Sequence, residues 1–158
     1  IVGLGAIGQR TAKLAQAFGC KIIAWNRTEK VVDNVTLVDK ETLFKESDIV
    51  SLHVALNDET RNFVTYKELS MMKPSAIIVN VARGPIINTK DLAKALQEGL
   101  ISGAALDVYD TEPPLEKDNL LLNRSNTILL PHIGFATEEA FEQRLDIVIT
   151  NVERFVSC

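Results

Sequence analysis

The feature that most constrains this chain is a glycine pattern close to its start. Gly3, Gly5 and Gly8 have the spacing G-x-G-x-x-G, after an apolar run at residues 1–4 and at the start of a helix-like segment at 6–18. In that context the first glycine permits a tight turn, the second lets a ligand approach the backbone, and the third lets the helix pack closely on the sheet. Free N–H groups at the helix start suit phosphate groups. The pattern predicts a dinucleotide-binding turn, and a glycine-rich turn without a ligand is the alternative.

The rest of the chain alternates short apolar runs with longer amphipathic segments. The apolar runs, which suit buried strands, lie at residues 1–4, 21–25, 48–54, 76–81, 101–106 and 127–130. Segments with helical character lie at residues 6–18, 39–46, 65–72, 90–97 and 137–155. This alternation is typical of repeated βα units, so it predicts an α/β fold: a Rossmann-type, doubly wound parallel sheet with helices on both faces. No repeat or linker divides the chain, and we expect one dinucleotide-binding domain over residues 1–158.

The bulk properties argue against several classes of partner. With 17 Lys and Arg against 21 Asp and Glu, the net charge is −4, which disfavours nucleic acid. No apolar run approaches the roughly 18 residues of a membrane span, and no signal-peptide pattern is present. Cys20 and Cys158 form no CxxC pair, which suits a reducing cytoplasm, the location we expect. No metal site is expected.

The residues that would meet the adenosine ribose carry no carboxylate. Dinucleotide sites usually place an Asp or Glu about 20 residues after the glycine turn, where it bonds the ribose 2′-hydroxyl. This chain has Asn26, Arg27 and Thr28 there. Asn26 can bond a hydroxyl, whereas Arg27 and Thr28 can hold a 2′-phosphate, so the pattern favours NADP(H) over NAD(H). The alternative is that Arg27 is a solvated turn residue or stacks on adenine in either cofactor.

Arg83, Glu112 and His132 each come shortly after a predicted strand. Ligands bind at the carboxyl ends of strands in a doubly wound sheet, so these side chains are expected to share one cleft. The planar guanidinium of Arg83 suits a carboxylate, which it can bind through two hydrogen bonds. Alternatively, Arg83 anchors its own loop by bonding backbone carbonyls. The second histidine of the chain, His53, is interpreted as structural.

Together these motifs resemble the cofactor domain of the D-isomer-specific 2-hydroxyacid dehydrogenases over nearly the whole chain. The matching segments are Gly-Leu-Gly-Ala-Ile-Gly at 3–8, Ser-Asp-Ile-Val-Ser-Leu-His at 47–53, Asn-Val-Ala-Arg-Gly at 80–84, Ala-Leu-Asp-Val at 105–108 with Glu-Pro at 112–113, and Pro-His-Ile-Gly at 131–134. The resemblance implies that Arg83 binds a 2-oxo acid, that His132 donates a proton to its carbonyl oxygen, and that Glu112 bonds the far side of the imidazole.

The resemblance also implies NAD(H) or NADP(H) as the cofactor, with Asp107 near the nicotinamide end, and a homodimer for the intact protein. The residues expected to bind the cofactor are Gly3, Gly5, Ala6, Ile7, Gly8, Asn26, Arg27, Thr28, Val54, Ala55, Thr60, Val81, Ala82, Arg83, Asp107, His132 and Gly134. Ala55 and Phe135 depart from the usual family pattern, at the adenine end and beside the pocket.

The implied reaction is hydride transfer between the nicotinamide and a small 2-oxo or D-2-hydroxy acid of the glyoxylate, hydroxypyruvate, phosphoglycerate or D-lactate type. An NAD(H)-sensing, corepressor-like scaffold is an alternative, since such family members retain the same three residues. A cofactor-binding domain without turnover is another. Because the chain begins at Ile1 inside a predicted strand, without an initiator methionine, we expect a fragment of a two-domain enzyme, inactive without the domain that closes the cleft.

Overall fold

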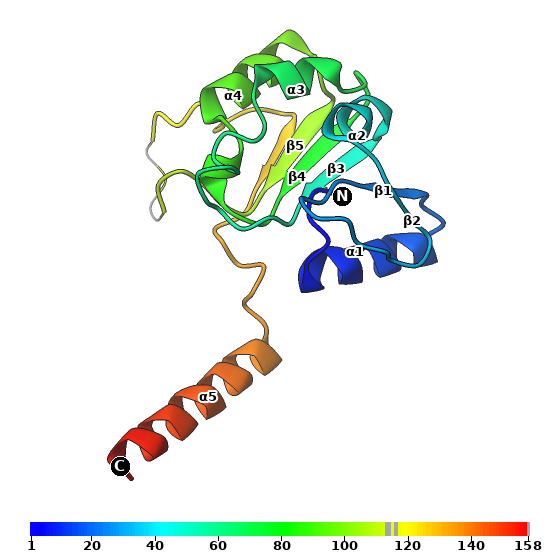
Figure 1. Ribbon diagram of the computed structural model, residues 1–158. Helices are drawn as coiled ribbons and strands as arrows, with labels where there is room; N and C mark the ends of the chain where they lie inside the picture. Colours follow the sequence, from blue (N-terminus) through cyan, green and yellow to red (C-terminus); the bar gives the residue numbers. More distant parts are fainter. Residues whose placement is uncertain (113–114, 116, 158) are drawn as a thin grey trace.

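The computed structural model describes residues 1–112, 115 and 117–157, in which parallel strands alternate with helices (Figure 1). Pro113, part of the predicted Glu-Pro motif, and Cys158 lie outside the described residues. The helices are α1 (Ala6–Ala17), α2 (Lys40–Glu46), α3 (Tyr66–Met71), α4 (Thr89–Glu98) and α5 (Glu138–Val156), with a 3-10 turn η1 at Gly84–Ile86. The strands are β1 (Ile22–Ala24), β2 (Val35–Leu37), β3 (Ile49–Leu52), β4 (Ile77–Asn80), β5 (Gly103–Leu106) and β6 (Thr127–Leu129).

Residues 1–4 lie between two groups of parallel strands. β1 pairs with β2, and β3, β4, β5 and β6 are neighbours in that order. Val2 bridges Trp25, just past β1, and Leu52, the last residue of β3. The N–H of Val2 donates to the carbonyl of Ser51 at 2.9 Å. Residues 1–4, predicted as a strand, therefore lie at the centre of the sheet and join the two groups of strands. The resulting strand order is that of a doubly wound fold.

The strand register brings the predicted functional segments to one edge of the sheet. Leu52, Asn80, Leu106 and Leu129 end their strands and pair directly with one another across the sheet. The loops after these residues therefore leave the sheet at the same level. Residues 1–4 run parallel to β1 and β3, so the glycine turn that follows them lies at this same edge of the sheet.

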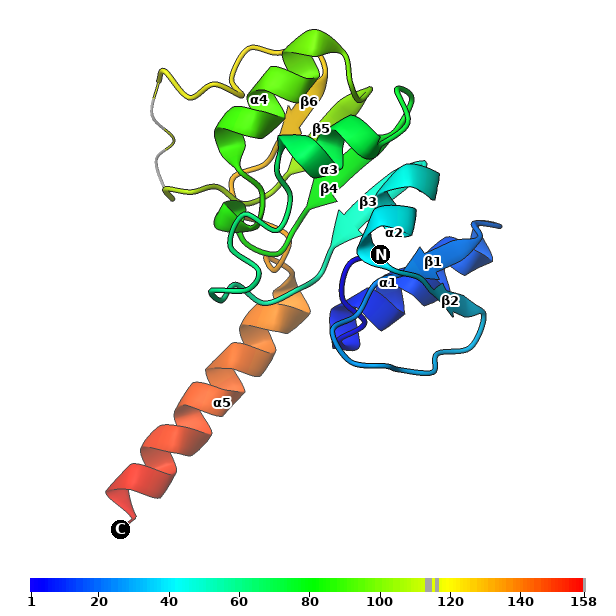
Figure 2. The same ribbon diagram turned by 45° about the horizontal axis from the view of Figure 1, so that its top comes forward.

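Alternation along the strands directs one set of side chains into the main core. Val50, Leu52, Ile78, Ala104 and Leu106 are buried against apolar side chains of α2, α3 and α4. The helix residues of this core include Leu43, Phe44, Leu69, Leu92, Ala95 and Leu96. Figure 2 shows α3 and α4 lying over β4 to β6. A second cluster forms where α1 packs through Ala12 against Ile1, Leu4, Ile22 and Ala24.

Isoleucines on the opposite face of β3, β4 and β6 are open to solvent. Ile49, Ile77 and Ile128 are 58%, 38% and 64% exposed, whereas the residues that follow the first two, Val50 and Ile78, are fully buried. α1 covers the second face only beside β1 and residues 1–4. The strands are thus apolar on both faces, as the sequence predicts, while helices α2 to α4 cover one of them.

The last helix projects away from the rest of the chain (Figures 1 and 2). α5 follows its predicted N-cap, Thr137, whose hydroxyl accepts from the N–H of Ala140 at 3.2 Å. None of its residues is buried, and its exposed apolar side chains include Phe141, Leu145 and Phe155. Among the described residues, no helix combines the length and apolarity that crossing a membrane requires.

Candidate active site

The glycine turn has the geometry that a dinucleotide requires. Gly3 has a φ of +93°, in the left-handed region, and a Cβ there would lie 2.8 Å from the carbonyl oxygen of His53. A Cβ on Gly8 would lie 2.0 Å from the carbonyl oxygen of Gly3, so α1 and the turn are in closest backbone contact. A Cβ on Gly5 would meet no atom within 4 Å. The backbone is therefore open at Gly5, where a pyrophosphate would approach, and packed at the other two glycines.

The end of β1 supports this turn through side chains. Asn26 Oδ1 accepts from the N–H of Leu4 at 2.9 Å, and Asn26 Nδ2 donates to the carbonyl of Thr28 at 2.8 Å. The ammonium group of Lys30 donates to the carbonyl of Leu4 at 3.0 Å. A cation thus lies against the glycine turn, beside the place where phosphates would bind. No local sequence pattern indicates Lys30 as a residue of the site.

A cavity of about 440 Å³ opens next to the glycine turn. Its lining includes seven of the expected cofactor residues: Gly3, Gly5, Asn26, Arg27, Val54, Ala55 and Thr60. The ring of Trp25 packs on Phe63 with centroids 4.8 Å apart, and both rings line the cavity. Such a volume and a mixed apolar and polar lining suit a nucleoside. The residues present therefore fit a dinucleotide held with its pyrophosphate at the turn and its adenosine in this cavity.

His53 lies beneath the glycine turn. Its ring Nε2 is 2.9 Å from the hydroxyl oxygen of Ser51, and its Nδ1 is buried without a hydrogen-bond partner within the described part of the chain. Burial lowers the pKa of His53. The imidazole is therefore neutral at physiological pH, and His53 also belongs to the lining of the cavity.

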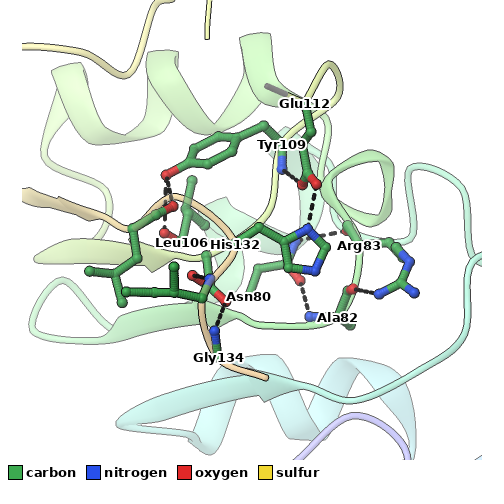
Figure 3. A network of polar contacts seen from close by, with 11 residues as sticks. Asn80, Ala82, Arg83, Leu106, Tyr109, Glu112, His132 and Gly134 are labelled. Atoms are coloured by element: carbon green, nitrogen blue, oxygen red, sulfur yellow. Dashed lines mark hydrogen bonds and ion pairs between the residues drawn. The ribbon is translucent and has the colours of Figure 1, made fainter. Parts of the chain in front are cut away.

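The loops after β4, β5 and β6 form a second polar cluster (Figure 3). His132 Nδ1 bonds Glu112 Oε2, and the other oxygen of Glu112 accepts from the N–H of Tyr109 at 2.7 Å. The side chains of His132 and Glu112 are 35% and 24% exposed, so the pair is partly shielded yet reachable. Because Glu112 engages Nδ1, the imidazole presents Nε2 as its other ring nitrogen, available for proton transfer.

The Arg83 loop is held against the loop that carries Glu112. Buried Asn80 accepts from the N–H of Ala82 at 3.1 Å and donates to the carbonyl of Arg83 at 2.9 Å. A Cβ on Gly84 would lie 2.0 Å from the carbonyl carbon of Tyr109, so the two loop backbones touch. The Arg83 guanidinium is exposed and donates to the carbonyl of Ala82 at 2.6 Å.

Asp107 fixes the loop that carries His132. One oxygen of this buried carboxylate accepts from the N–H of Ile133 at 2.9 Å, and the other accepts from the N–H of Gly134 at 2.7 Å. The Tyr109 hydroxyl donates to the carbonyl of Leu130 at 2.7 Å, at the start of the same loop. His132 itself has a φ of +53°, a left-handed conformation that is unusual outside glycine. The position of the imidazole thus depends on hydrogen bonds from two residues that follow β5.

Phe135 adds an aromatic contact to this loop. Its ring lies edge-on to the His132 imidazole at 5.7 Å, and the Arg144 guanidinium of α5 lies 4.6 Å from the centre of the same ring. The Phe135 side chain therefore contacts both the His132 imidazole and α5.

Residues 1–134 match the family described as "D-isomer specific 2-hydroxyacid dehydrogenase, NAD binding domain". The chain belongs to this family. The matched region ends at Gly134, within the loop that carries His132, so it contains both the glycine turn and the polar cluster of this D-isomer specific 2-hydroxyacid dehydrogenase domain.

Two similar proteins are named as reductases. The glyoxylate reductase of Thermococcus litoralis is 47% identical over 159 residues, which cover 98% of this chain and 47% of that protein. The hydroxypyruvate reductase of Blautia hydrogenotrophica is 39% identical, with 99% of this chain and 49% of that protein covered. The chain spans about half the length of the relatives it matches.

Solved structures agree with the fold. The NAD complex of a D-isomer specific 2-hydroxyacid dehydrogenase from Lactobacillus delbrueckii ssp. bulgaricus superposes with a TM-score of 0.88 at 33% identity, covering 99% of this chain and 51% of that one. An acyclic imino acid reductase in complex with NADPH and D-Arg also reaches 0.88, at 36% identity, covering 99% and 50%. The Rossmann-type fold and a nicotinamide dinucleotide as the cofactor are thereby confirmed for this family domain.

Proposed function

We propose that this chain is the cofactor-binding half of a two-domain enzyme that interconverts a small 2-oxo acid and its D-2-hydroxy acid. The observation that carries the proposal is the Glu112–His132 pair, beside the Arg83 loop and at the same sheet edge as the glycine turn. The similarity to glyoxylate and hydroxypyruvate reductases favours those two 2-oxo acids as substrates. The share of those relatives that the chain covers supports a second, substrate-binding domain.

The roles of the chain's own residues follow from their chemistry. The exposed guanidinium of Arg83 would bind the substrate carboxylate and polarise the neighbouring carbonyl. Glu112 orients the imidazole through Nδ1, so that Nε2 of protonated His132 would donate to the carbonyl oxygen during reduction and take the proton back during oxidation. Lys30 and the turn at Gly5 would hold the pyrophosphate. The bound nicotinamide supplies the hydride.

The test is an assay of the full-length protein that contains this chain. With NADH or NADPH, we expect glyoxylate or hydroxypyruvate, and less readily pyruvate, to oxidise the reduced cofactor, followed by its absorbance. The isolated chain should bind the cofactor with little or no turnover, because water is not excluded from an uncovered cleft. Cofactor binding by the full-length protein without turnover on any of these acids would overturn the proposal and favour a cofactor-sensing scaffold.

We further propose a preference for NADP(H), supported by the Arg27 guanidinium on the cavity wall. Replacing Arg27 by alanine should weaken NADPH binding on the order of ten-fold, since a charge-assisted hydrogen bond to the 2′-phosphate is lost. NADH binding should change less than about two-fold on the same scale. Trp25 is the single tryptophan and lines the cavity, so its fluorescence reports both titrations. An unchanged ratio of the two dissociation constants would contradict the preference.

We also propose a homodimer in the cytoplasm as the working state of the intact protein, acting on small molecules and not on nucleic acid or membranes. The exposed isoleucines of β3, β4 and β6 support an apolar interface, and the net charge of −4 disfavours contact with a phosphate backbone. The cysteine content supports a reducing compartment.

A further inference from the structure

The cavity beside the glycine turn contains an acid that the sequence pattern did not indicate. Arg27 Nη1 lies 3.1 Å from Glu59 Oε2, although 32 residues separate the two in the sequence. Both side chains line the cavity. Arg27 and Glu59 are 70% and 71% exposed, so the pair meets solvent at the cavity mouth.

The side chains of Asn57 and Thr60 hold the backbone around Glu59. Asn57 Oδ1 accepts from the N–H groups of both Glu59 and Thr60 at 3.0 Å, which makes a tight turn. The Thr60 hydroxyl in turn donates to the carbonyl of Ala55 at 2.6 Å. The loop after β3 is thereby closed on itself. These bonds fix the backbone of Glu59 beside the cavity, and the exposed carboxylate reaches Arg27 from there.

Glu59 is a carboxylate beside a position where the usual dinucleotide pattern has an acid and this sequence has none. A carboxylate near the ribose 2′-position normally accepts a hydrogen bond from the hydroxyl of NAD(H) and repels the phosphate of NADP(H). The end of β1 lacks that acid, since Asn26, Arg27 and Thr28 stand there. Glu59 brings a carboxylate to the side chain of Arg27 from a different loop.

We propose that Glu59 is a specificity-determining residue that counteracts Arg27, so that the preference for NADPH over NADH is smaller than Arg27 alone would give. This inference rests on the proposed binding of a nicotinamide dinucleotide in the cavity. Arg27 attracts a 2′-phosphate, and the Glu59 carboxylate repels it. The ion pair itself does not lock Arg27, because exposed pairs of this kind are weak. The guanidinium keeps further donors for a phosphate.

Neutralising the carboxylate provides the test. In Glu59→Gln we expect NADPH binding to tighten roughly five- to ten-fold, the size of one unit charge acting on a doubly charged phosphate about 6 Å away in water. NADH binding should change less than about two-fold, because the side-chain carbonyl oxygen of glutamine can still accept a hydrogen bond from the 2′-hydroxyl. The gain for NADPH should shrink in high salt, which screens exposed charges. The readout is Trp25 fluorescence in titrations of the chain with each dinucleotide.

Asp58→Asn is the matched control. It removes the same charge one residue earlier, and Asp58 is exposed and does not line the cavity. We expect it to change the NADPH to NADH affinity ratio far less than Glu59→Gln. In the double variant Arg27→Ala/Glu59→Gln the ratio should fall between the ratios of the two single variants. Circular dichroism confirms that each variant is folded.

The outcomes separate this inference from the proposal on which it rests. An unchanged ratio in Glu59→Gln, a weaker binding of NADPH, or an equal effect of Asp58→Asn would each overturn the role of Glu59 while leaving dinucleotide binding intact. If the unmodified chain binds neither NADH nor NADPH, the proposed function fails and the inference fails with it.

Discussion

In the full-length protein, His132→Asn is expected to lower kcat for 2-oxo acid reduction on the order of 10²- to 10⁴-fold, the usual cost of losing a general acid. The imidazole is the group that Glu112 orients and that would deliver the proton to the carbonyl oxygen. KM for the 2-oxo acid should change little, because its carboxylate is assigned to Arg83. Steady-state kinetics with glyoxylate or hydroxypyruvate measure both parameters.

The control for this variant is cofactor binding. The cavity that holds Trp25 lies at the glycine turn, and His132 is not part of its lining. The dissociation constants for NADH and NADPH, followed by tryptophan fluorescence, should therefore stay within about two-fold of the original values. A kcat loss smaller than about ten-fold would remove His132 from the role of general acid.

Two alanine substitutions in the glycine turn should separate ligand approach from packing. Gly5 has a φ of −68° and open space around its missing Cβ, so Gly5→Ala should leave the melting temperature nearly unchanged. The methyl group would nevertheless stand where the pyrophosphate meets the backbone. We expect dinucleotide binding to weaken on the order of 10- to 100-fold, a loss equivalent to about 1.4 to 2.8 kcal/mol.

Gly8→Ala should damage the fold as well. Its Cβ would lie 2.0 Å from the carbonyl oxygen of Gly3, so either α1 or the turn must move. We expect a loss of about 3 kcal/mol in the free energy of unfolding, or on the order of 10 °C in melting temperature, together with loss of binding. Thermal unfolding by circular dichroism and the fluorescence titration measure the two effects.

Retained affinity in Gly5→Ala would show that the ligand does not approach the backbone there.

Much of the fold is readable from the sequence, because local pattern and chain direction act together. The glycine spacing between an apolar run and a helix predicted the turn, and the apolar runs after it predicted five of the strands that follow. β2 (Val35–Leu37) was missed. It has only three residues, one of them the polar Thr36, and its pairing with β1 is a tertiary contact that no local period reveals.

Which face of the sheet is exposed could not be predicted from the sequence either. A run such as that of β3, apolar on both sides, indicates that both faces are suited to burial. It does not say which element covers them. That Ile49 is exposed while Val50 is buried follows only from where α2 and α3 pack.

The candidate site could be predicted where the residue type and its place after a strand were both informative. Arg83, Glu112 and His132 met that condition, and the structure pairs two of them. Lys30 and Glu59 did not meet it. They are ordinary charged residues in loops, and their proximity to the glycine turn and to Arg27 arises from how separate loops pack together.

The left-handed backbone at His132 divides the possible replacements into two groups. Asparagine and glycine adopt this conformation at little cost, whereas alanine costs about 1–2 kcal/mol and a β-branched residue costs more. A saturation library at this position would therefore report two properties at once. The asparagine and glycine variants lose only the proton donor, whereas the valine and isoleucine variants lose the loop geometry as well. The activity of the first two variants therefore measures the contribution of the proton donor without distortion of the loop.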